Sequence, residues 1–302
     1  MVQPSFVRSN GDIELTDRSP AFAWYELLTI DAAAARDFYG RVIGWQTQDA
    51  STAAFPYAVF SSDKTEVAGL MELPPEGRRM GATPRWVGYV AVDDVDGTVN
   101  RLKSLGGSVY VPPTDSNIGR VSIVADPQLA NLGMVSGLKR GGRLPDLDQP
   151  GQVGWHELFA ADCKKAFAFY SDLFGWQGAA GERELLDPYQ LLSAGGHMMG
   201  GMFNKLPRVP TPFWLYYFNV ADIAVATACV KQAGGRVVQG PMPIPDGIWI
   251  ARCIDPQGAM FSLQGTTSDR TIESASTSEL NWAADWGGFA SRGKVVAKPK
   301  RR

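Results

Sequence analysis

Histidine and cysteine are scarce in this 302-residue chain, and neither forms a recognisable metal-binding or disulfide motif. There are only two histidines, His156 and His197, and the three cysteines are far apart with no C-x-x-C spacing. This pattern excludes a disulfide framework and a zinc knuckle, so we expect reduced, mostly structural thiols. An iron site made of two histidines and one carboxylate would need both histidines in one module and on one face, so the sequence disfavours iron chemistry.

Long apolar runs and a strong excess of charge are also missing. No stretch approaches the roughly 20 apolar residues that span a bilayer, and residues 1–19 lack the apolar core of a signal peptide. Apolar residues make up 45% and charged residues 20% of the chain, as in an ordinary globular protein, and the net charge is -2. We therefore expect a cytoplasmic protein with no membrane partner.

Charge is unevenly distributed at the C-terminal end. The last eleven residues contain six Lys or Arg and no acidic residue, whereas the rest of the chain is acidic. A short basic run of this kind is more often a solvated tail than a nucleic-acid-binding segment, so we expect no nucleic-acid partner. Trp282 and Trp286 lie four residues apart just before this tail and would share one helix face if they docked onto the body.

An internal repeat determines the organisation of the chain. Seven residues recur 131 positions later, namely Trp24, Glu26, Asp31, Phe38, Tyr39, Gly44 and Trp45. The Asp-Pro-Gln sequence at 126–128 recurs at 255–257. The repeat predicts two modules, at 20–137 and 153–266. A Gly- and Pro-rich linker at 138–152 joins them, and an N-terminal segment (1–19) and a C-terminal extension (267–302) flank them.

Each module contains the same succession of predicted elements twice. In the first, a strand at 24–30 precedes a helix that Asp31 caps and Gly44 ends, and short strands follow at 57–60 and 67–71. The succession restarts with a strand at 86–92 and a helix after Asp94. The second module repeats it, with strands at 155–159 and 214–220. This predicts an α+β fold made of four βαβββ units.

These units resemble the vicinal oxygen chelate superfamily, which contains glyoxalase I, extradiol dioxygenases, fosfomycin-resistance enzymes and bleomycin-resistance binding proteins. The motifs that carry the resemblance are W-x-E-L, F-Y-x-x-x-x-G-W and the Asp-Pro-Gln hairpin, each present in both modules. The resemblance implies tandem modules whose curved mixed sheets form two cups flanked by helices. It also implies a small-molecule ligand.

The resemblance further implies where a divalent metal would bind, and those positions hold unsuitable residues. The first-strand ligand position falls on Trp24 and Trp155, and the last-strand position falls on Gly133 and Ser262. The middle-strand position, where a histidine would stand, falls on Trp86-Val87 and Trp214-Leu215. We therefore expect no metal or other cofactor, and a divalent metal only through unusual ligands; an extradiol dioxygenase is disfavoured.

Each cup is expected to present one tryptophan and one carboxylate. Trp24 and Glu26, like Trp155 and Glu157, lie two residues apart on a strand and so share a face. An aromatic wall with a carboxylate suits a flat or amine-bearing ligand. Burial beside the tryptophans would also raise the pKa of either glutamate, which makes Glu26 and Glu157 the candidate catalytic bases.

Two points about the cups stay open. Trp86 and Trp214 begin their strands; we include them among the candidate ligand-binding residues, with a core position as the alternative. Each glutamate also has a structural alternative, in which a Trp N–H, an arginine or a backbone amide holds it and it simply closes the sheet.

The sequence thus supports three hypotheses. The first is a glyoxalase/bleomycin-resistance-like protein that binds an aromatic or amine-bearing molecule without the usual metal centre. The second is a glyoxalase-like lyase or isomerase that uses Glu26 or Glu157 as general base or as an atypical metal ligand. The third is a protein-interaction role for Trp282, Trp286 and the basic tail. Both a monomer and a homodimer are compatible with the tandem arrangement.

Overall fold

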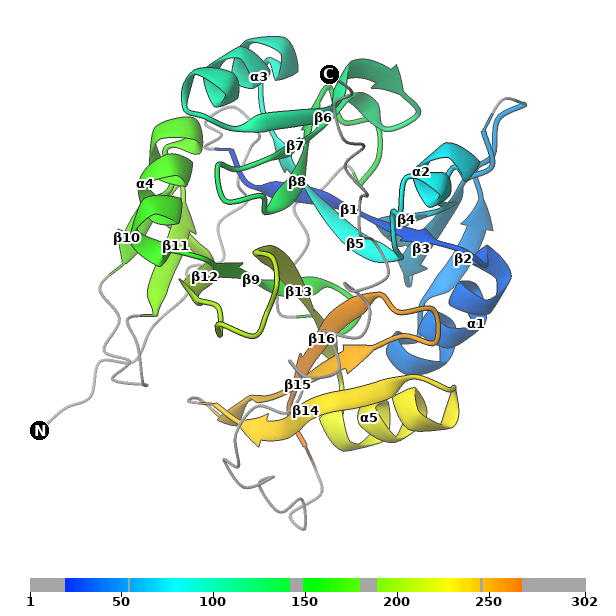
Figure 1. Ribbon diagram of the computed structural model, residues 1–302. Helices are drawn as coiled ribbons and strands as arrows, with labels where there is room; N and C mark the ends of the chain where they lie inside the picture. Colours follow the sequence, from blue (N-terminus) through cyan, green and yellow to red (C-terminus); the bar gives the residue numbers. More distant parts are fainter. Residues whose placement is uncertain (1–19, 54, 142–148, 180–188, 245–246, 268–302) are drawn as a thin grey trace, which may run out of the picture.

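The computed structural model describes residues 20–53, 55–141, 149–179, 189–244 and 247–267. The predicted N-terminal segment and the C-terminal extension beyond Thr267, including Trp282 and Trp286, lie outside the described residues. In the described parts, the chain folds as two modules (Figure 1).

The elements of the first module are β1 (Phe22–Thr29), α1 (Ala32–Ile43), β2 (Gln46–Asp49), β3 (Ala58–Ser62), β4 (Thr65–Glu72), α2 (Pro75–Arg79), β5 (Arg85–Ala91), α3 (Val95–Ser104), β6 (Ser108–Ser116), β7 (Gly119–Ala125) and β8 (Asn131–Ser136). Those of the second module are β9 (Val153–Ala160), α4 (Cys163–Phe174), β10 (Gln177–Ala179), β11 (Gln190–Ala194), β12 (His197–Asn204), β13 (Phe213–Val220), α5 (Ile223–Gln232), β14 (Arg236–Pro243), β15 (Trp249–Ile254) and β16 (Met260–Gly265).

Each module forms one eight-stranded mixed sheet. The strand order is β2-β3-β4-β1-β5-β8-β7-β6 in the first and β10-β11-β12-β9-β13-β16-β15-β14 in the second. The two central strands of a sheet are antiparallel, and each also pairs in parallel with the last strand of its own unit. This arrangement confirms the α+β class and the four βαβββ units, with α2 as an addition in the first module.

The first helix of each module begins and ends as the repeat predicts. The Asp31 side chain accepts a hydrogen bond from the N–H of Ala34 at 3.0 Å, and Asp162 accepts one from Lys165 at 3.1 Å, so each aspartate satisfies an otherwise unpaired N–H of the first turn. Gly44 and Gly175 end α1 and α4 with φ of 88° and 73°, a left-handed conformation that glycine adopts without strain.

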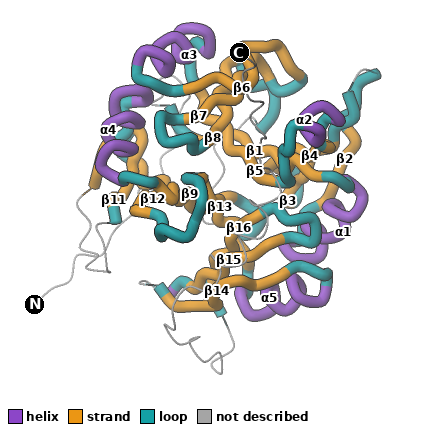
Figure 2. Tube along the Cα trace, in the orientation of Figure 1, coloured by secondary structure: helices purple, strands orange, loops and turns teal. Residues whose placement is uncertain are grey.

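The helices of each module pack against those of the other. α1 contacts α5, and α3 contacts α4, so two helix pairs lie across the boundary between the modules (Figures 1 and 2). A single hydrophobic core contains buried residues of both modules, including Phe38 and Phe261, whose ring centroids lie 5.8 Å apart. Gly235 makes this packing possible, because a Cβ there would lie only 2.8 Å from the Phe38 ring.

The two Asp-Pro-Gln hairpins join the modules reciprocally. The Gln257 side chain accepts a hydrogen bond from the N–H of Asp31 at 2.8 Å and donates one to its carbonyl at 2.9 Å. The Gln128 side chain makes the same pair with Asp162, at 2.7 and 2.9 Å. Because each module contributes the same residue to the other, the interface is that of a two-fold symmetric dimer within one chain.

Repeat-equivalent residues meet on the pseudo-two-fold axis. The Tyr25 hydroxyl lies 2.6 Å from Nε2 of His156, its own counterpart in the second module. Nδ1 of His156 lies 2.6 Å from the carbonyl oxygen of Met199. Since a carbonyl can only accept, Nδ1 carries the proton and Nε2 accepts the hydrogen of Tyr25. His156 thus faces the core, as strand alternation predicts, and His197 is exposed.

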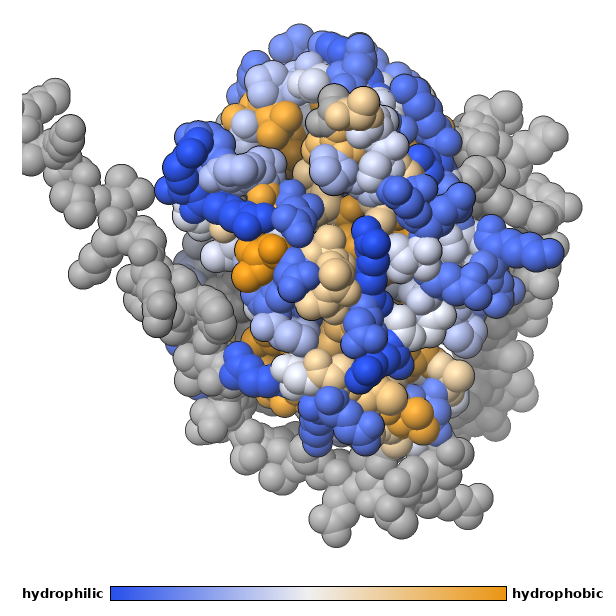
Figure 3. Space-filling view, turned by 90° about the vertical axis from the view of Figure 1, so that its right-hand side faces the viewer, coloured by the Kyte–Doolittle hydropathy of each residue, from blue (hydrophilic) through white to orange (hydrophobic). Residues whose placement is uncertain are grey.

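The surface seen from the right-hand side of Figure 1 is largely hydrophilic, with smaller apolar areas between the polar side chains (Figure 3). In the described part of the chain, no helix combines the length and the apolar character needed to cross a membrane.

Candidate functional site

Strand pairing places a tryptophan, a glutamate and a tyrosine on the same face of each sheet, which we call the cup. In the first module Trp24 pairs with Tyr89 and Glu26 pairs with Val87, and residues paired across neighbouring strands project to the same side. The first cup is therefore the sheet face that carries Trp24, Glu26 and Tyr89. The second cup is the equivalent face with Trp155, Glu157 and Tyr217.

Two tyrosines hold the carboxyl group of the first cup. The hydroxyl of Tyr57 donates to Oε1 of Glu26 at 2.6 Å, and that of Tyr89 donates to Oε2 at 2.5 Å. Nε1 of Trp24 donates to the Tyr57 hydroxyl at 3.2 Å. Gly69 and Gly133 leave room for the two rings, since a Cβ at Gly69 would overlap Tyr57 and a Cβ at Gly133 would overlap Tyr89.

Burial dominates the ionisation of Glu26. The side chain is 5% exposed, and burial raises the pKa of the Glu26 carboxyl above its usual range, although the hydrogen bonds from Tyr57 and Tyr89 partly oppose this rise. No basic residue is hydrogen-bonded or ion-paired to Glu26 in the described part of the chain. The first cup is therefore a buried, hydrogen-bonded cluster in which no described basic residue pairs with the carboxyl group.

The start of the linker covers the first cup. Leu138 packs against the apolar residues of the cup, and a Cβ at Gly141 would lie 3.4 Å from the Trp24 ring. Between them, the Arg140 guanidinium lies 5.9 Å from the centre of the Tyr57 ring and 2.9 Å from Oε1 of Glu66. As a result Trp24 and Tyr57 are only 1% and 2% exposed.

Within the described residues, the second cup contains an ion pair that the first one lacks. Nη2 of Arg252 lies 2.9 Å from Oε2 of Glu157, and the same oxygen accepts a short hydrogen bond from the Tyr217 hydroxyl. The Tyr189 hydroxyl donates to the other oxygen at 3.1 Å, and Trp155 donates to Tyr189 at 2.9 Å. The arrangement of Trp, Tyr, Glu and Tyr is thus conserved between the cups, with an arginine added in the second.

Among the described residues, the second cup is also the more open one. Trp155 and Tyr189 are half-buried, whereas their counterparts Trp24 and Tyr57 are almost fully buried. Beneath them, Glu157 and Arg252 are 6% and 8% exposed. Around the cup lie half-buried apolar side chains, namely Phe203, Leu206, Phe213, Val238, Met242 and Ile244. The second cup therefore has a polar floor within an apolar, partly accessible wall.

Trp86 and Trp214 do not lie in the cups, which corrects their inclusion among the ligand-binding residues. Trp86 pairs with Leu27 and so projects to the face opposite Glu26. Its Nε1 donates to the hydroxyl of Tyr39 at 2.9 Å, and Trp214 makes the equivalent bond to Tyr170 at 3.1 Å. Both tryptophans belong to the core between the modules, and the core alternative is the one the structure supports.

The tyrosines that bind the two glutamates were not among the predicted site residues. Arg252 is the arginine that the structural alternative allowed for Glu157, but its position was not predicted. A signal for the tyrosines was present, since Tyr89 recurs as Tyr217 with the same 128-residue displacement as Val92 and Val220. Arg252 had no such signal, because the equivalent residue of the first module is Ile123: each lies directly across from its last-strand residue, Ser262 or Gly133. A residue that differs between the two modules cannot be found by comparing the modules for shared residues.

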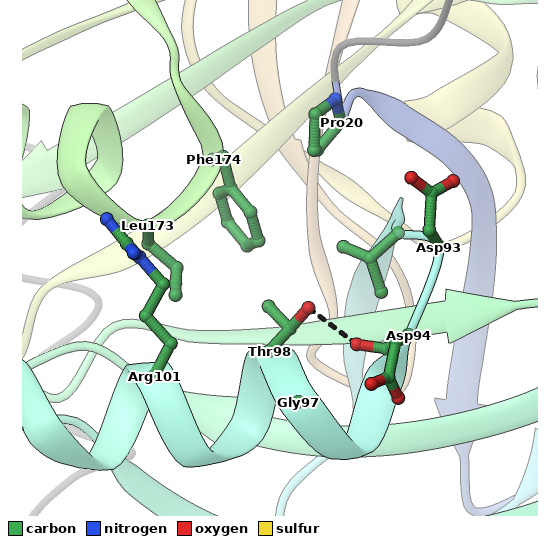
Figure 4. A pocket seen from close by; sticks show the side chains of 9 residues that line it. Pro20, Asp93, Asp94, Gly97, Thr98, Arg101, Leu173 and Phe174 are labelled. Carbon is green, nitrogen blue, oxygen red and sulfur yellow. Dashed lines mark hydrogen bonds between the residues drawn. The ribbon is translucent and has the colours of Figure 1, made fainter.

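Two open cavities of about 300 and 370 Å³ lie away from the cups, along the α3–α4 contact. In the first, Phe174 of α4 faces Thr98 of α3, with Pro20 on a third side (Figure 4). The polar groups of this cavity already have partners: the Thr98 hydroxyl donates to the Asp94 carbonyl at 2.6 Å, and Arg101 donates to the carbonyl of Asp172. These cavities mark looser packing between modules and hold none of the predicted site residues.

Comparison with known proteins agrees with this architecture. The sequence profile of the Glyoxalase/Bleomycin resistance protein/Dioxygenase superfamily matches residues 21–128 and 152–263, which is one match in each module. The chain belongs to this superfamily. A relative from Mycobacterium tuberculosis (strain CDC 1551 / Oshkosh), named "Putative glyoxylase CFP32", is 34% identical over 244 residues, which cover 80% of this chain and 92% of the relative.

Other proteins match more weakly or in fold alone. The anthracycline biosynthesis protein DnrV of Streptomyces peucetius is 36% identical over 122 residues, 40% of this chain and 43% of that protein. Among solved structures, a Mn(II)-bound glyoxalase from Novosphingobium aromaticivorans has a TM-score of 0.57 at 15% identity and covers 85% of this chain and 84% of that one. A 4-hydroxymandelate synthase mutant from Streptomyces coelicolor has a TM-score of 0.57 at 14% identity, over 89% and 98% of the two chains. At these identities the structures show a shared fold alone.

The donor set of the cups does not fit a divalent metal. Where superfamily members that use a metal place ligands, the first cup has Trp24 and the ring of Tyr89 over Gly133, and the second has Trp155 and Ser262. Within the described residues, no three His, Cys, Asp or Glu side chains come together as a metal site would require. The predicted absence of a metal cofactor stays a prediction, and we derive no chemical step through a metal.

Proposed function

We propose that this superfamily member binds a flat aromatic small molecule in its second cup, without the usual metal centre. The observation that carries the proposal is the difference between the two cups: Trp155 and Tyr189 are half-buried, whereas the linker segment 138–141 covers their counterparts in the first cup. An aromatic ligand that packs on the indole of Trp155 would gain about 0.5–1.5 kcal/mol beyond the burial of its apolar area.

The apolar wall of the second cup supports the same function. Phe203, Phe213 and Met242 are half-buried in this wall, and such side chains adapt well to a flat apolar ligand. Arg252 also lies over the rings of Phe159 and Phe203, at 5.0 and 6.0 Å, so even the polar floor is packed against aromatic surface. The relatives named for anthracycline biosynthesis are consistent with this view, since an anthracycline is a flat polycyclic aromatic molecule.

The alternative, a glyoxalase-like lyase or isomerase with Glu26 or Glu157 as general base or metal ligand, has less support. Both carboxyl oxygens of Glu26 accept tyrosine hydrogens, and the residue is nearly inaccessible. Glu157 is hydrogen-bonded at both oxygens and paired with Arg252. A general base must come within hydrogen-bonding reach of the substrate proton, and both carboxyl groups are buried behind the groups that donate to them. Stoichiometric divalent metal in the purified protein that is lost in Glu157→Gln would favour the enzyme hypothesis instead.

The binding function is tested by tryptophan fluorescence quenching with 2-naphthol as a flat aromatic probe. We expect saturable binding that Trp155→Ala abolishes. The matched control is Trp249→Ala, because Trp249 is also a half-buried tryptophan of the second module but packs against the core on the opposite face. No saturable binding, or equal binding by Trp155→Ala and Trp249→Ala, would overturn the proposal.

A further inference from the structure

Ser262 lies on the floor of the second cup. It pairs directly with Tyr217 on one side and with Arg252 on the other, the two residues that contact Oε2 of Glu157. Its chain neighbours Phe261 and Leu263 project to the opposite face, into the core between the modules. The side chain of Ser262 therefore points into the cup.

The hydroxyl of Ser262 is buried and has no hydrogen-bond partner among the described residues. The residue is 0% exposed, and none of the surrounding polar groups, including Glu157, Arg252 and Tyr217, bonds to its Oγ. A buried hydroxyl without a partner lowers stability, because folding removes its hydrogen bonds to water and returns nothing. The first cup avoids this situation: its equivalent residue is Gly133, over which the ring of Tyr89 lies.

The charge on the floor of the cup is already balanced. The carboxylate of Glu157 and the guanidinium of Arg252 form a buried pair at 2.9 Å, and Arg252 also donates to Gln239 at 2.5 Å. A cationic ligand would meet the guanidinium, an anionic one would meet the carboxylate, and either would have to leave water without a counter-ion of its own. The floor therefore favours a neutral ligand and disfavours the amine-bearing class that the carboxylate alone suggested.

We propose that the ligand of the second cup is a neutral, flat aromatic molecule carrying a phenol or carbonyl oxygen, and that Ser262 determines this specificity by hydrogen-bonding to that oxygen. The inference rests on the proposed binding function and names its ligand class. Trp155 and the apolar wall hold the ring system, while Ser262 recognises the oxygen and gains the partner that it lacks in the unliganded chain.

Four naphthyl probes of nearly equal size test the proposal by fluorescence quenching and isothermal titration calorimetry. They are 2-naphthol, naphthalene, 2-naphthoate and 1-naphthylmethylammonium, which differ in the oxygen and in the charge. We expect 2-naphthol to bind most tightly, with about fivefold weaker binding of naphthalene, the value of one net hydrogen bond. The two charged probes should bind about tenfold more weakly or worse, since both carry an uncompensated charge into the cup.

The Ser262→Ala variant separates recognition by the hydroxyl from general apolar binding. It should weaken 2-naphthol about fivefold and leave naphthalene unchanged, so that the two probes bind alike. Ser122→Ala is the matched control, since Ser122 is equally buried but lies in the first module and already donates to the Val111 carbonyl at 2.7 Å. Ser262→Gly introduces the residue found at the equivalent position of the first module. It should behave like Ser262→Ala, which would show that the effect comes from loss of the hydroxyl and not from the methyl group of alanine.

The possible results separate failure of the binding function from failure of the Ser262 assignment. If none of the four probes binds saturably, the proposed binding function itself fails. If they bind but a charged probe equals 2-naphthol, or if Ser262→Ala weakens naphthalene as much as 2-naphthol, the function stands and the assignment of Ser262 and of a neutral ligand is wrong.

Discussion

Nη2 of Arg252 lies 2.9 Å from Oε2 of Glu157, whereas the residue that corresponds to Arg252 in the first module is Ile123. The two cups therefore share a Trp-Tyr-Glu-Tyr arrangement but differ in charge. In the first, Glu26 is bound by tyrosine hydroxyls and covered by the start of the linker. In the second, Glu157 is paired with an arginine and lies beneath half-buried aromatic residues. We propose that the first cup is part of the core and that the second is the ligand site.

The first prediction concerns the buried ion pair. Arg252→Met should lower the free energy of unfolding by about 3 kcal/mol or more, because it leaves the Glu157 carboxylate buried without its partner. The double variant Arg252→Met/Glu157→Gln should recover most of this loss, since no unpaired charge is left. Urea denaturation measures the free energy of unfolding of both variants.

Arg120→Met provides the comparison for this experiment. Arg120 pairs with Asp96 and Asp115 at exposed positions, so its loss should change the free energy of unfolding by less than about 1 kcal/mol. An Arg252→Met variant that is as stable as Arg120→Met would show that the Glu157 pair is not buried in solution.

The second prediction is a pH dependence from Glu26. Because its pKa is raised in the folded state, the folded protein holds a proton that the unfolded chain has released, so Glu26 stabilises the fold at low pH and this contribution is lost as the pH rises through the folded pKa. Glu26→Gln cannot lose a proton. Its stability relative to the wild type, from urea denaturation between pH 5 and 8, should therefore increase with pH. A difference that does not change with pH would contradict a raised pKa of Glu26.

The third prediction has the opposite sign and concerns His156. Burial lowers the pKa of His156 to about 4 from 6.5, so the unfolded chain takes up a proton first and stability falls as the pH drops from 6.5 towards 4. The loss should approach about 3 kcal/mol relative to His156→Gln, which keeps a donor for Met199 and an acceptor for Tyr25. Replacing the exposed His197 with Gln should leave the pH dependence unaltered; an equal effect of both replacements would sink the assignment.

The fourth prediction concerns the reciprocal hairpin contacts. Gln257→Ala and Gln128→Ala each remove the hydrogen bonds that bind the first helix of the other module, and each should lower the free energy of unfolding by about 1–2 kcal/mol. Both glutamines make the same pair of bonds with a helix-capping aspartate, and Gln257 also accepts hydrogen bonds from the Thr29 hydroxyl and the N–H of Ile30, so both variants should be destabilised, Gln257→Ala at least as much as Gln128→Ala. Gln46→Ala, on the exposed strand β2, should have no measurable effect. Loss of stability in only one of the two hairpin variants would argue against a symmetric interface.

The sequence predicted the fold well because the repeat and the helix caps are local signals. The spacing of Asp31 and Gly44 defined α1 within one residue at each end, and the same pattern defined α4. The repeat did not show why its residues recur. Tyr39 and the Asp-Pro-Gln hairpin recur because they meet across the modules: the Tyr39 hydroxyl donates to Asp255 at 3.1 Å.

The candidate site was predicted only in part. Alternation along the strand placed Trp24 with Glu26 and Trp155 with Glu157 correctly, because this rule needs no knowledge of the neighbouring strands. The face of the sheet to which Trp86 projects depends on how β5 pairs with β1, and these strands are far apart in the sequence. The closure of the first cup depended on where the linker runs, and the chemistry of the second depended on Arg252, 95 residues from Glu157.

The most direct test of the whole account is the number of ligand sites in one chain, measured by isothermal titration calorimetry with 2-naphthol. We expect one site per chain in the wild type and none in Trp155→Ala, because the chain itself fills the first cup. Two equivalent sites, or one site that persists in Trp155→Ala, would contradict the division of the two cups into core and binding site.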